Sequence, residues 1–282
     1  MNWFSLTLLS VFIVSIANIL QRILMKDDKS NPYSYAIIFH LLLGVINLVF
    51  AMIHGFQPLP LNANLIGFML AVVLWGIGTI FLFKALQLLE SSEVTILTSI
   101  RALVTIVASM LFLHESFNGQ KVLGTIIILA SIFLVTNFKK GAKFFNKGVV
   151  YSLAMAFFYG LAVVVDVFNL KNYEPISYIA IGNFMIGFIL LLIYPKALKQ
   201  WRDFVKPEFL KKMMPLGILS SVQGIAYVFA LTKGPASQIA PISQAQVIVT
   251  VLLAVIVLKE RTNLFRKIIA AFLVMFGVIL LM

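Results

Sequence analysis

The sequence predicts an all-α integral membrane protein with ten transmembrane helices, arranged as two inverted five-helix repeats. Three observations predict this fold class. The 282 residues are 61% hydrophobic and 11% charged, with a mean hydropathy of +1.04, so folding around a water-soluble core would leave an apolar surface. Ten apolar runs are long enough to cross a bilayer, and the second half of the chain repeats the pattern of the first.

The apolar runs have the length of membrane-spanning helices. A helix needs about 20 residues to cross a hydrocarbon layer about 30 Å thick, and charge, Pro, Gly or Asn bound each run. We expect spans at 3–25, 35–54, 64–87, 92–113, 120–138, 148–169, 175–194, 213–231, 237–258 and 264–282. They form a first repeat at 1–138 and a second repeat at 148–282, with a basic linker at 139–147.

The basic residues predict the orientation of the chain. Of the 22 lysines and arginines, 18 lie in or beside the connections that follow the odd-numbered spans. Such loops remain in the cytoplasm, so both termini are expected outside the cell inner or plasma membrane. The net charge of +12 is therefore a topology signal. It predicts the lipid bilayer as a partner, with anionic lipid compatible, and no nucleic acid.

An internal repeat relates the two halves. With a shift of 145 residues, "ALQLLESSEVTILTSIRALVTIVASMLFLHESFN" at 85–118 aligns without a gap with "ALTKGPASQIAPISQAQVIVTVLLAVIVLKERTN" at 230–263. A shift of 143 pairs upstream residues, among them Gly44 with Gly187. Because each half has an odd number of spans, the second half would cross the membrane in the opposite direction.

These segments carry a resemblance to a known family. In both halves an Ala-Leu pair precedes a short polar break and an apolar helix ending in Glu, and "ALTKGPAS" through "VLKERTN" is the most specific part. The chain resembles the EamA family of the drug/metabolite transporter superfamily over essentially its whole length. The resemblance implies a solute carrier whose central cavity is lined mainly by spans 1, 3, 4, 6, 8 and 9, without naming the substrate.

Polar side chains inside the spans are the first candidate ligands, because they are costly in hydrocarbon unless protein or water surrounds them. Arg101 stands near the middle of the fourth span, where a lipid-facing charge costs about 3 kcal/mol. We expect it to face inward and bind an anion or carboxylate, with a structural ion pair as the alternative. Pro241 is expected to bend the ninth span, where Ser243, Gln244 and Gln246 face a cavity or hydrogen-bond another helix.

Further substrate-binding candidates occur at near-helical spacing on single spans. Residues three or four positions apart lie on one helix face, so each pair can line the same cavity. For the aromatic residues, packing or anchoring at the membrane interface is the alternative. These candidates are Asn18, which shares a face with Gln21, the pair Trp75 and Thr79, and the pair Gln223 and Tyr227.

Titratable residues inside the spans are candidates for coupling. Asp166 is the acidic residue that falls within an apolar span, and we expect it to bind a coupling ion or a cation. Histidine can titrate in the physiological range, so His40 is the second candidate, with a hydrogen-bonded packing role as the alternative. Glu115 and Glu260 occur at equivalent positions and are expected to stabilise the N-termini of the fifth and tenth spans.

Several function classes lack their signatures. The spans show no clustered nucleophile, base or HExxH motif for an enzyme, and no phosphate-binding GxxxxGK[ST] loop. The absence of cysteine excludes thiolate metal sites, and no metal or cofactor is expected. We expect a secondary transporter that moves a small amino-acid-like or zwitterionic metabolite by alternating access, as a monomer or a homodimer. The alternatives are a multidrug or lipophilic-cation exporter and a non-transporting structural or lipid-handling subunit.

Overall fold

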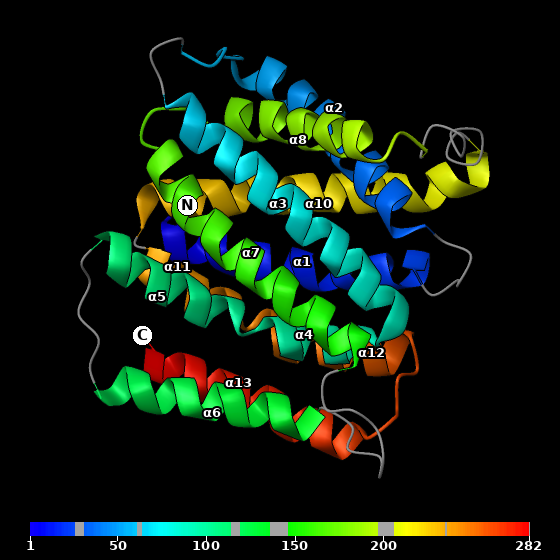
Figure 1. Ribbon diagram of the computed structural model, residues 1–282, viewed down its shortest axis with the longest axis vertical. Helices are drawn as coiled ribbons and strands as arrows, with labels where there is room; N and C mark the ends of the chain where they lie inside the picture. Colours follow the sequence, from blue (N-terminus) through cyan, green and yellow to red (C-terminus); the bar gives the residue numbers. More distant parts are fainter. Residues whose placement is uncertain are drawn as a thin grey trace.

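The helices run roughly side by side along one direction (Figure 1). The computed structural model describes residues 1–25, 31–60, 64–113, 119–135, 146–196, 206–234 and 236–281, and within these the secondary structure is helical without a strand. The α-helices are α1 (Trp3–Met25), α2 (Pro32–His54), α3 (Leu65–Leu88), α4 (Ser91–Thr98), α5 (Arg101–Leu113), α6 (Gly119–Val135), α7 (Lys147–Asn169), α8 (Pro175–Ile193), α10 (Pro207–Lys233), α11 (Ala236–Ser243), α12 (Gln246–Val257) and α13 (Leu264–Leu281).

Seven segments of the described chain are long and apolar enough to cross a membrane: Trp3–Met25, Pro32–His54, Leu65–Leu88, Ser91–Phe112, Lys147–Asn169, Pro175–Ile193 and Pro207–Lys233. The protein is therefore an all-helical membrane protein. The prediction of ten spans exceeds this number and stays a prediction.

Local sequence explains where the helices begin. Asn31 accepts hydrogen bonds from the backbone of Tyr33 and Ser34 at 3.0 and 3.4 Å, and Pro32 occupies the first turn of α2, where a missing N–H costs nothing. The predicted start of the eighth span at 213 is wrong, because α10 begins at Pro207. A proline is favourable there for the same reason, so the helix extends through a charged stretch that hydropathy alone excludes.

The fourth and ninth predicted spans are each interrupted. A bend was expected in the ninth span at Pro241, whereas no interruption was expected in the fourth. The fourth breaks between α4 and α5 at 99–100, and the ninth breaks between α11 and α12 at 244–245, an identical position in the repeat. At both breaks backbone N–H groups bond three residues back, as Ser99 does to Ile96 and Ala245 does to Ile242. Each break is thus one tight turn of the 3₁₀ type.

Helix packing follows the internal repeat. The pair α3 and α7 corresponds to the pair α10 and α1, and both pairs are in extensive contact. The pair α5 and α7 corresponds in the same way to α12 and α1, whereas α2 packs on its own counterpart α8 and α6 on its counterpart α13. Exchanging the halves therefore reproduces these helix pairs, as a two-fold pseudo-symmetry requires.

Two glycines show this symmetry in atomic detail at the α2–α8 crossing. A Cβ on Gly44 would lie 2.8 Å from the ring of Phe184, and a Cβ on Gly187 would lie 2.7 Å from a methyl group of Leu41. With the shift of 143 residues, Gly44 corresponds to Gly187 and Leu41 to Phe184. Leu41 and Phe184, which occupy equivalent positions, therefore each pack against the glycine of the other helix. The two backbones can lie close together because neither glycine carries a side chain.

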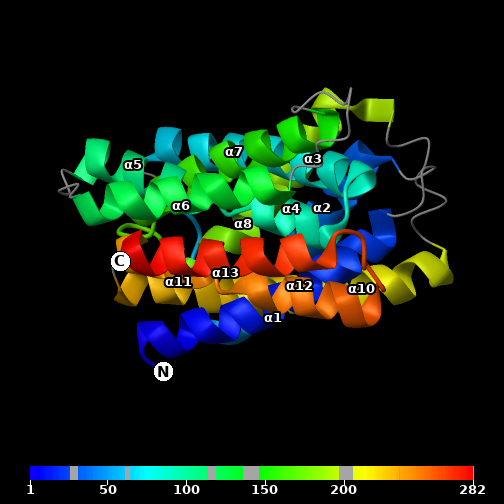
Figure 2. The same cartoon turned by 90° about the horizontal axis from the view of Figure 1, so that it is seen from below.

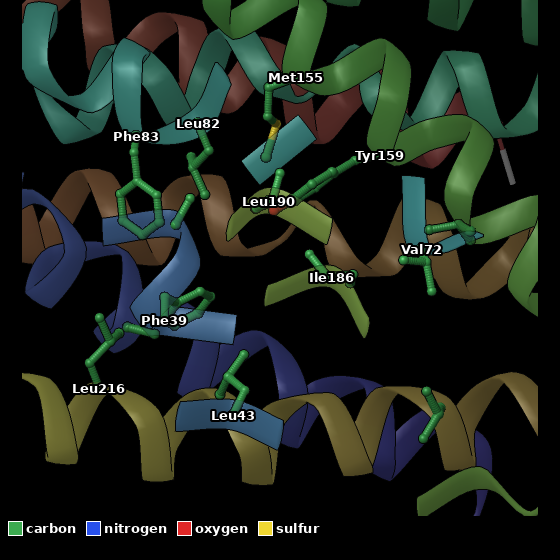
Figure 3. Close-up of a cluster of buried hydrophobic side chains, with 14 of the residues drawn as sticks. Phe39, Leu43, Val72, Leu82, Phe83, Met155, Tyr159, Ile186, Leu190 and Leu216 are labelled. Carbon is green, nitrogen blue, oxygen red and sulfur yellow. The ribbon is translucent and has the colours of Figure 1, made fainter. Parts of the chain in front are cut away.

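The core lies where the two halves meet. Figure 3 shows part of its largest cluster, in which Phe39, Phe83, Met155 and Leu216 come from α2, α3, α7 and α10 and pack together. Both chain ends lie at the same end of the bundle (Figures 1 and 2). This agrees with the expectation that both termini share one side of the membrane.

Candidate functional site

A cavity of about 240 Å³ lies between the two halves. Its wall combines apolar residues with polar ones from both repeats, and helices α2 and α8 contribute beside those that the family resemblance implied. The polar or charged residues in the wall are Ser10, Asn18, Gln21, His40, Asn47, Trp75, Ser91, Thr95, Thr98, Tyr159, Arg101, Asp166, Tyr178, Asn183, Ser220, Gln223, Tyr227, Ser243 and Gln246.

Thr98 and Ser243, which lie beside the two helix breaks, line the wall. Ser99 donates its hydroxyl hydrogen to the Ile96 carbonyl at 2.6 Å, and Ser243 donates to the Ile239 carbonyl at 2.8 Å. These bonds satisfy carbonyl groups beside each 3₁₀ turn. Ile96 occupies the position equivalent to Pro241, so a proline is not needed to break the helix. The side chain of Pro241 lies outside the described part of the structure.

The polar residues of the ninth span have different surroundings. Gln244, predicted to bind substrate, is buried and donates to the carbonyl of Ala240 in its own helix at 3.3 Å; it is not among the described residues of the cavity wall. Ser243 and Gln246 do line the cavity. The backbone carbonyl of Gln246 also accepts a bond from Ser15 on α1 at 3.5 Å, which ties the broken helix to the first half.

Arg101 is the first residue of α5 and lines the cavity. Among the described residues, no hydrogen bond or ion pair joins its guanidinium to another side chain or carbonyl. Tyr227 on α10 lies within range of the charges of both Arg101 and Asp166. The guanidinium is therefore a cation in the wall with its five donors open to a bound molecule.

Asp166 is held by two donors from other helices. Trp75 on α3 donates its indole N–H to Oδ2 at 2.9 Å, and Tyr178 on α8 donates its hydroxyl hydrogen to Oδ1 at 2.5 Å. Asn169 also donates to the Tyr178 oxygen at 3.1 Å. The carboxylate is 4% exposed, so these hydrogen bonds replace most of its hydration. Asp166 and Arg101 line the same cavity without forming an ion pair with each other.

His40 makes hydrogen bonds through both ring nitrogens. Its Nδ1 lies 2.8 Å from Oδ1 of Asn183 on α8, and its Nε2 lies 2.8 Å from Oγ1 of Thr79 on α3. Thr79, predicted to bind substrate, lies behind the wall and connects His40 to the hydroxyl of Tyr159 at 2.8 Å. Gly78 permits this contact, since a Cβ there would lie 2.4 Å from the Tyr159 ring.

Other predicted residues meet across the two halves. Asn18 on α1 donates to Thr250 on α12 at 3.4 Å, and Gln223 on α10 donates to Ser10 on α1 at 2.9 Å. Two further oxygens in the wall, Gln21 Oε1 and Asn47 Oδ1, are buried without a hydrogen-bond partner in the described structure. Buried acceptors of this kind are costly unless water or a ligand satisfies them. No group of residues suited to hold a metal ion occurs among the described residues.

Tyr159, Tyr178 and Asn183 are site residues that the sequence analysis missed. The signal for Asn183 was available, because the shift of 143 residues pairs it with His40. Since α2 and α8 are counterparts that cross each other, residues at equivalent positions near the crossing meet. Tyr159 also stands seven residues before Asp166, on the same face of α7.

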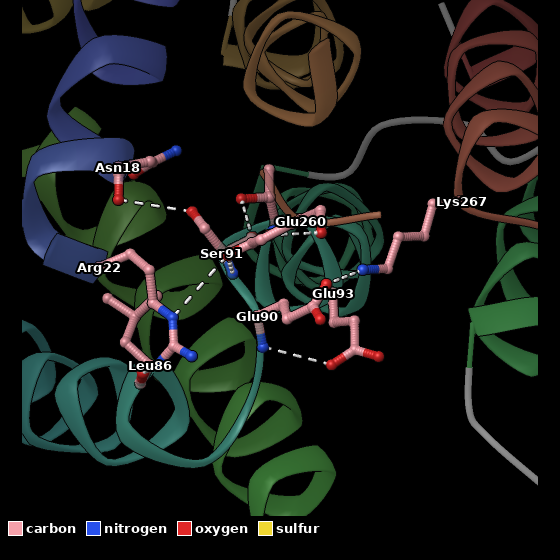
Figure 4. Close-up of polar contacts among 10 residues, drawn as sticks. Asn18, Arg22, Leu86, Glu90, Ser91, Glu93, Glu260 and Lys267 are labelled. Atoms are coloured by element: carbon pink, nitrogen blue, oxygen red, sulfur yellow. Dashed lines mark hydrogen bonds and ion pairs between the residues drawn. The ribbon is translucent and has the colours of Figure 1, made fainter. Parts of the chain in front are cut away.

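Glu260 has a role that differs from the prediction. It was expected to stabilise the N-terminus of the tenth span, but its carboxylate accepts from the backbone N–H groups of Ser91 and Ser92 at 3.0 and 3.2 Å, at the start of α4 (Figure 4). Arg22 on α1 lies 3.8 Å from it. Glu260 therefore links the halves at one end of the bundle. Glu115 lies outside the described residues.

The comparisons with known proteins agree with this architecture. A solved structure described as "Crystal structure of protein" matches with a TM-score of 0.70 over 98% of this chain and 96% of that chain. Its sequence is 15% identical, so the likeness concerns the fold alone. No curated protein matches the chain. The model of the EamA-like transporter family matches residues 1–137 and 146–282, and the chain therefore belongs to this family of membrane transporters.

Proposed function

We propose that the protein is a secondary transporter of a small zwitterionic metabolite, such as an amino acid, which it binds in the cavity between its halves and releases by alternating access. The observation that carries the proposal is the unpaired guanidinium of Arg101 in the cavity wall. A partly buried cation without a partner is costly, and a substrate carboxylate would satisfy it with charge-assisted hydrogen bonds.

The rest of the wall suits the other end of a zwitterion. Within the described part of the chain, Gln21 and Asn47 each offer a buried oxygen without a donor, and Asp166 adds a carboxylate to the same cavity. A substrate ammonium group donates three hydrogen bonds and would satisfy such acceptors. The cavity of about 240 Å³ limits the substrate to a small molecule.

Arg101→Ala tests the proposal directly. We expect substrate affinity to fall about 10- to 150-fold, because one charge-assisted interaction contributes roughly 1.5 to 3 kcal/mol. Arg101→Lys should recover only part of this, since the planar fork of donors is lost. Binding is measured by thermal shift with a panel of amino acids, and transport by counterflow in proteoliposomes.

Arg266→Ala is a matched control, because Arg266 on α13 is an exposed arginine outside the cavity wall. It should leave affinity unchanged. Stable Arg101→Ala protein that binds every substrate with the affinity of the native chain would contradict the proposal. Loss of folded protein together with normal binding by the remainder would assign Arg101 a structural role instead.

A lipophilic-cation exporter is the second candidate. Asp166 and the aromatic residues Trp75, Tyr159 and Tyr178 of the same wall favour it, because aromatic faces and a carboxylate attract organic cations. Tetraphenylphosphonium in the counterflow panel separates the two candidates. A protein that exchanges neither class of solute would be a structural or lipid-handling subunit.

The orientation of the chain follows from its loop charges and is testable because the sequence contains no cysteine. Gln120 at the start of α6 and Lys147 at the start of α7 are both exposed. In intact cells an impermeant thiol reagent should label Gln120→Cys from outside, while Lys147→Cys reacts only after the membrane is opened. The reverse pattern would place both termini in the cytoplasm.

A further inference from the structure

The wall of the cavity contains a hydrogen-bonded chain that ends at His40. Asn183 donates its amide hydrogen to the carbonyl of Ile179 at 2.7 Å, which turns its oxygen towards His40 Nδ1. An oxygen at that position accepts a hydrogen bond, so Nδ1 carries a hydrogen. In neutral His40 the other nitrogen, Nε2, is therefore an acceptor that faces Thr79.

The hydroxyl of Thr79 has three partners at hydrogen-bond distance. They are Nε2 of His40 at 2.8 Å, the hydroxyl of Tyr159 at 2.8 Å and the backbone carbonyl of Trp75 at 2.9 Å. A hydroxyl has one hydrogen and can rotate it between acceptors. It can therefore point to the imidazole nitrogen or to the carbonyl while the oxygen stays in place.

This geometry satisfies both charge states of His40. When the ring is neutral, Thr79 donates to Nε2 and accepts from Tyr159. When Nε2 gains a hydrogen, it donates to Thr79, whose own hydrogen turns to the Trp75 carbonyl. Every buried donor then keeps an acceptor, and no heavy atom needs to move. A histidine that only packs in a core and stays neutral does not need the Trp75 carbonyl as an alternative acceptor for the Thr79 hydrogen.

We propose that His40 is the binding site of a proton that is transported with the substrate, and that the proton reaches it from the cavity through Tyr159 and Thr79. Tyr159 lines the cavity. It takes one proton from a hydronium ion there and passes its own to Thr79, which passes its own to Nε2; one water is left behind. The proposal rests on the proposed transport function and names the ion that drives it.

The surrounding groups link this proton to the substrate. A positive His40 would add to the charge of Arg101, so a substrate carboxylate bound in the same cavity favours protonation, and protonation favours the carboxylate. Proton and substrate then move together. The titratable or charged groups that share the wall with His40 are Asp166 and Tyr159 on α7, Tyr178 on α8, Arg101 on α5 and Tyr227 on α10.

Proteoliposomes with a pH gradient test the proposal. The quantity compared is the steady-state accumulation of substrate, divided by the rate of counterflow of the same preparation. With one proton per zwitterionic substrate and the membrane potential clamped at zero, a gradient of one pH unit supports accumulation of about tenfold in the native protein. His40→Gln, which cannot titrate, should show no accumulation, whereas His54→Gln, a histidine of α2 outside the cavity wall, should match the native ratio.

Thr79 supplies a pair of variants for the relay. Thr79→Val removes the hydroxyl and should lower the accumulation ratio, while Thr79→Ser keeps it and should restore the ratio. Counterflow without pH-driven accumulation in the native protein would overturn the proton site and leave the transport function standing. Absence of counterflow in the native protein would contradict the transport function itself.

Nitrogen NMR of ¹⁵N-labelled histidine checks the site without altering it. The chain has 3 histidines, so His54→Gln and His114→Gln leave His40 alone. We expect the Nδ1–H tautomer in neutral protein and a second ring hydrogen on acidification while the protein remains folded. An Nε2–H tautomer, or a ring that stays neutral until unfolding, would overturn the proposal.

Discussion

The two ends of the cavity are held by different chemistry, although equivalent helices reach them. Arg22 and Asp166 each stand three residues before the last residue of a 23-residue helix, α1 and α7. At the Arg22 end, charged side chains connect the halves: Glu260 binds the start of α4 and lies 3.8 Å from Arg22, and Lys267 pairs with Glu90 (Figure 4).

At the Asp166 end the Asp166 carboxylate lies among aromatic rings. Phe68, Tyr173 and Tyr178 lie with ring centroids 5.6 to 6.0 Å apart, and each is at most 5% exposed. Separating this end exposes apolar area, whereas separating the Arg22 end breaks charge-assisted hydrogen bonds. The two ends are thus stabilised by different interactions, although equivalent helices of the repeat reach them.

Of the changes that test the difference between the two ends, removing Glu260 should reduce the free energy of unfolding most. Glu260→Ala leaves Arg22 without its acid partner and the first N–H groups of α4 without an acceptor. We expect the free energy of unfolding in detergent to fall by about 3 to 5 kcal/mol. Glu208→Ala, which removes an exposed acid in the first turn of α10, is the control. A loss in Glu260→Ala as small as in the control would show that charge does not hold the Arg22 end.

Asp166→Asn should have a smaller effect at the opposite end. The amide keeps one acceptor oxygen for Trp75 or Tyr178 but presents a donor to the other, so we expect a loss of about 1.5 to 3 kcal/mol of stability. Trp75 fluorescence, in a background with Trp3→Phe and Trp201→Phe, should shift as its indole loses the carboxylate. Unchanged fluorescence would mean that the carboxylate does not position the ring.

The same variant also tests coupling. Asp166 is the second proposed coupling residue beside His40, and loss of pH-driven accumulation with retained exchange would support that role. Accumulation equal to that of the native protein would leave His40 as the coupling residue and assign Asp166 to the structure of its end.

Replacing Glu174 should have the smallest effect on the free energy of unfolding, and this effect should depend on pH. Its carboxylate accepts from the backbone of Ile176 and Ser177 at the start of α8. Burial acts to raise the pKa of Glu174, but the bonds from Ser177 and Ile176 and the charge of His54 together lower it below its ordinary value. Because the pKa of Glu174 is lower in the folded state, the ionised side chain stabilises the fold when the pH is above its pKa in the unfolded chain, which is about 4.3. This stabilisation is lost as the pH falls through the pKa of the folded state.

Glu174→Gln should therefore lose about 0.5 to 1 kcal/mol at neutral pH, the size of a helix-cap effect, and the loss should vanish in acid. Thermal unfolding at pH 7 and in acid measures both. A difference between native and variant protein that is the same at both pH values would show that the cap does not depend on the charge.

Much of the fold could be predicted from the sequence because hydrocarbon imposes a length on each helix. The bounds of α1 match the prediction, and α7 differs by one residue at its start. The interruptions at 99–100 and 244–245 could not be predicted from hydropathy, since Ser99 and Gln244 bond to their own helix and leave the run apolar overall. The same local bonds explain why Gln244 is absent from the cavity wall.

The sequence could predict those residues of the cavity wall whose charge would be costly in contact with lipid. Arg101 and Asp166 fall in this class, because charge in lipid is expensive whatever the rest of the fold does. Thr79 was predicted to line the cavity but lies behind its wall. The spacing of residues on a helix indicates which way a side chain points, but not whether the cavity or another side chain lies in that direction. Its contact with His40 and Tyr159 depends on how closely α3 and α7 pack, which Gly78 sets.

The contact between His40 and Asn183 has a further consequence. A chain built from two identical halves would place the same side chain at both positions, and two histidines facing each other would compete for one hydrogen between them. Here one position is a base and the other an amide that does not titrate. The pair therefore has room for a single extra proton. The number of protons moved in each transport cycle would then be set by the presence of histidine in one half and asparagine at the equivalent position of the other.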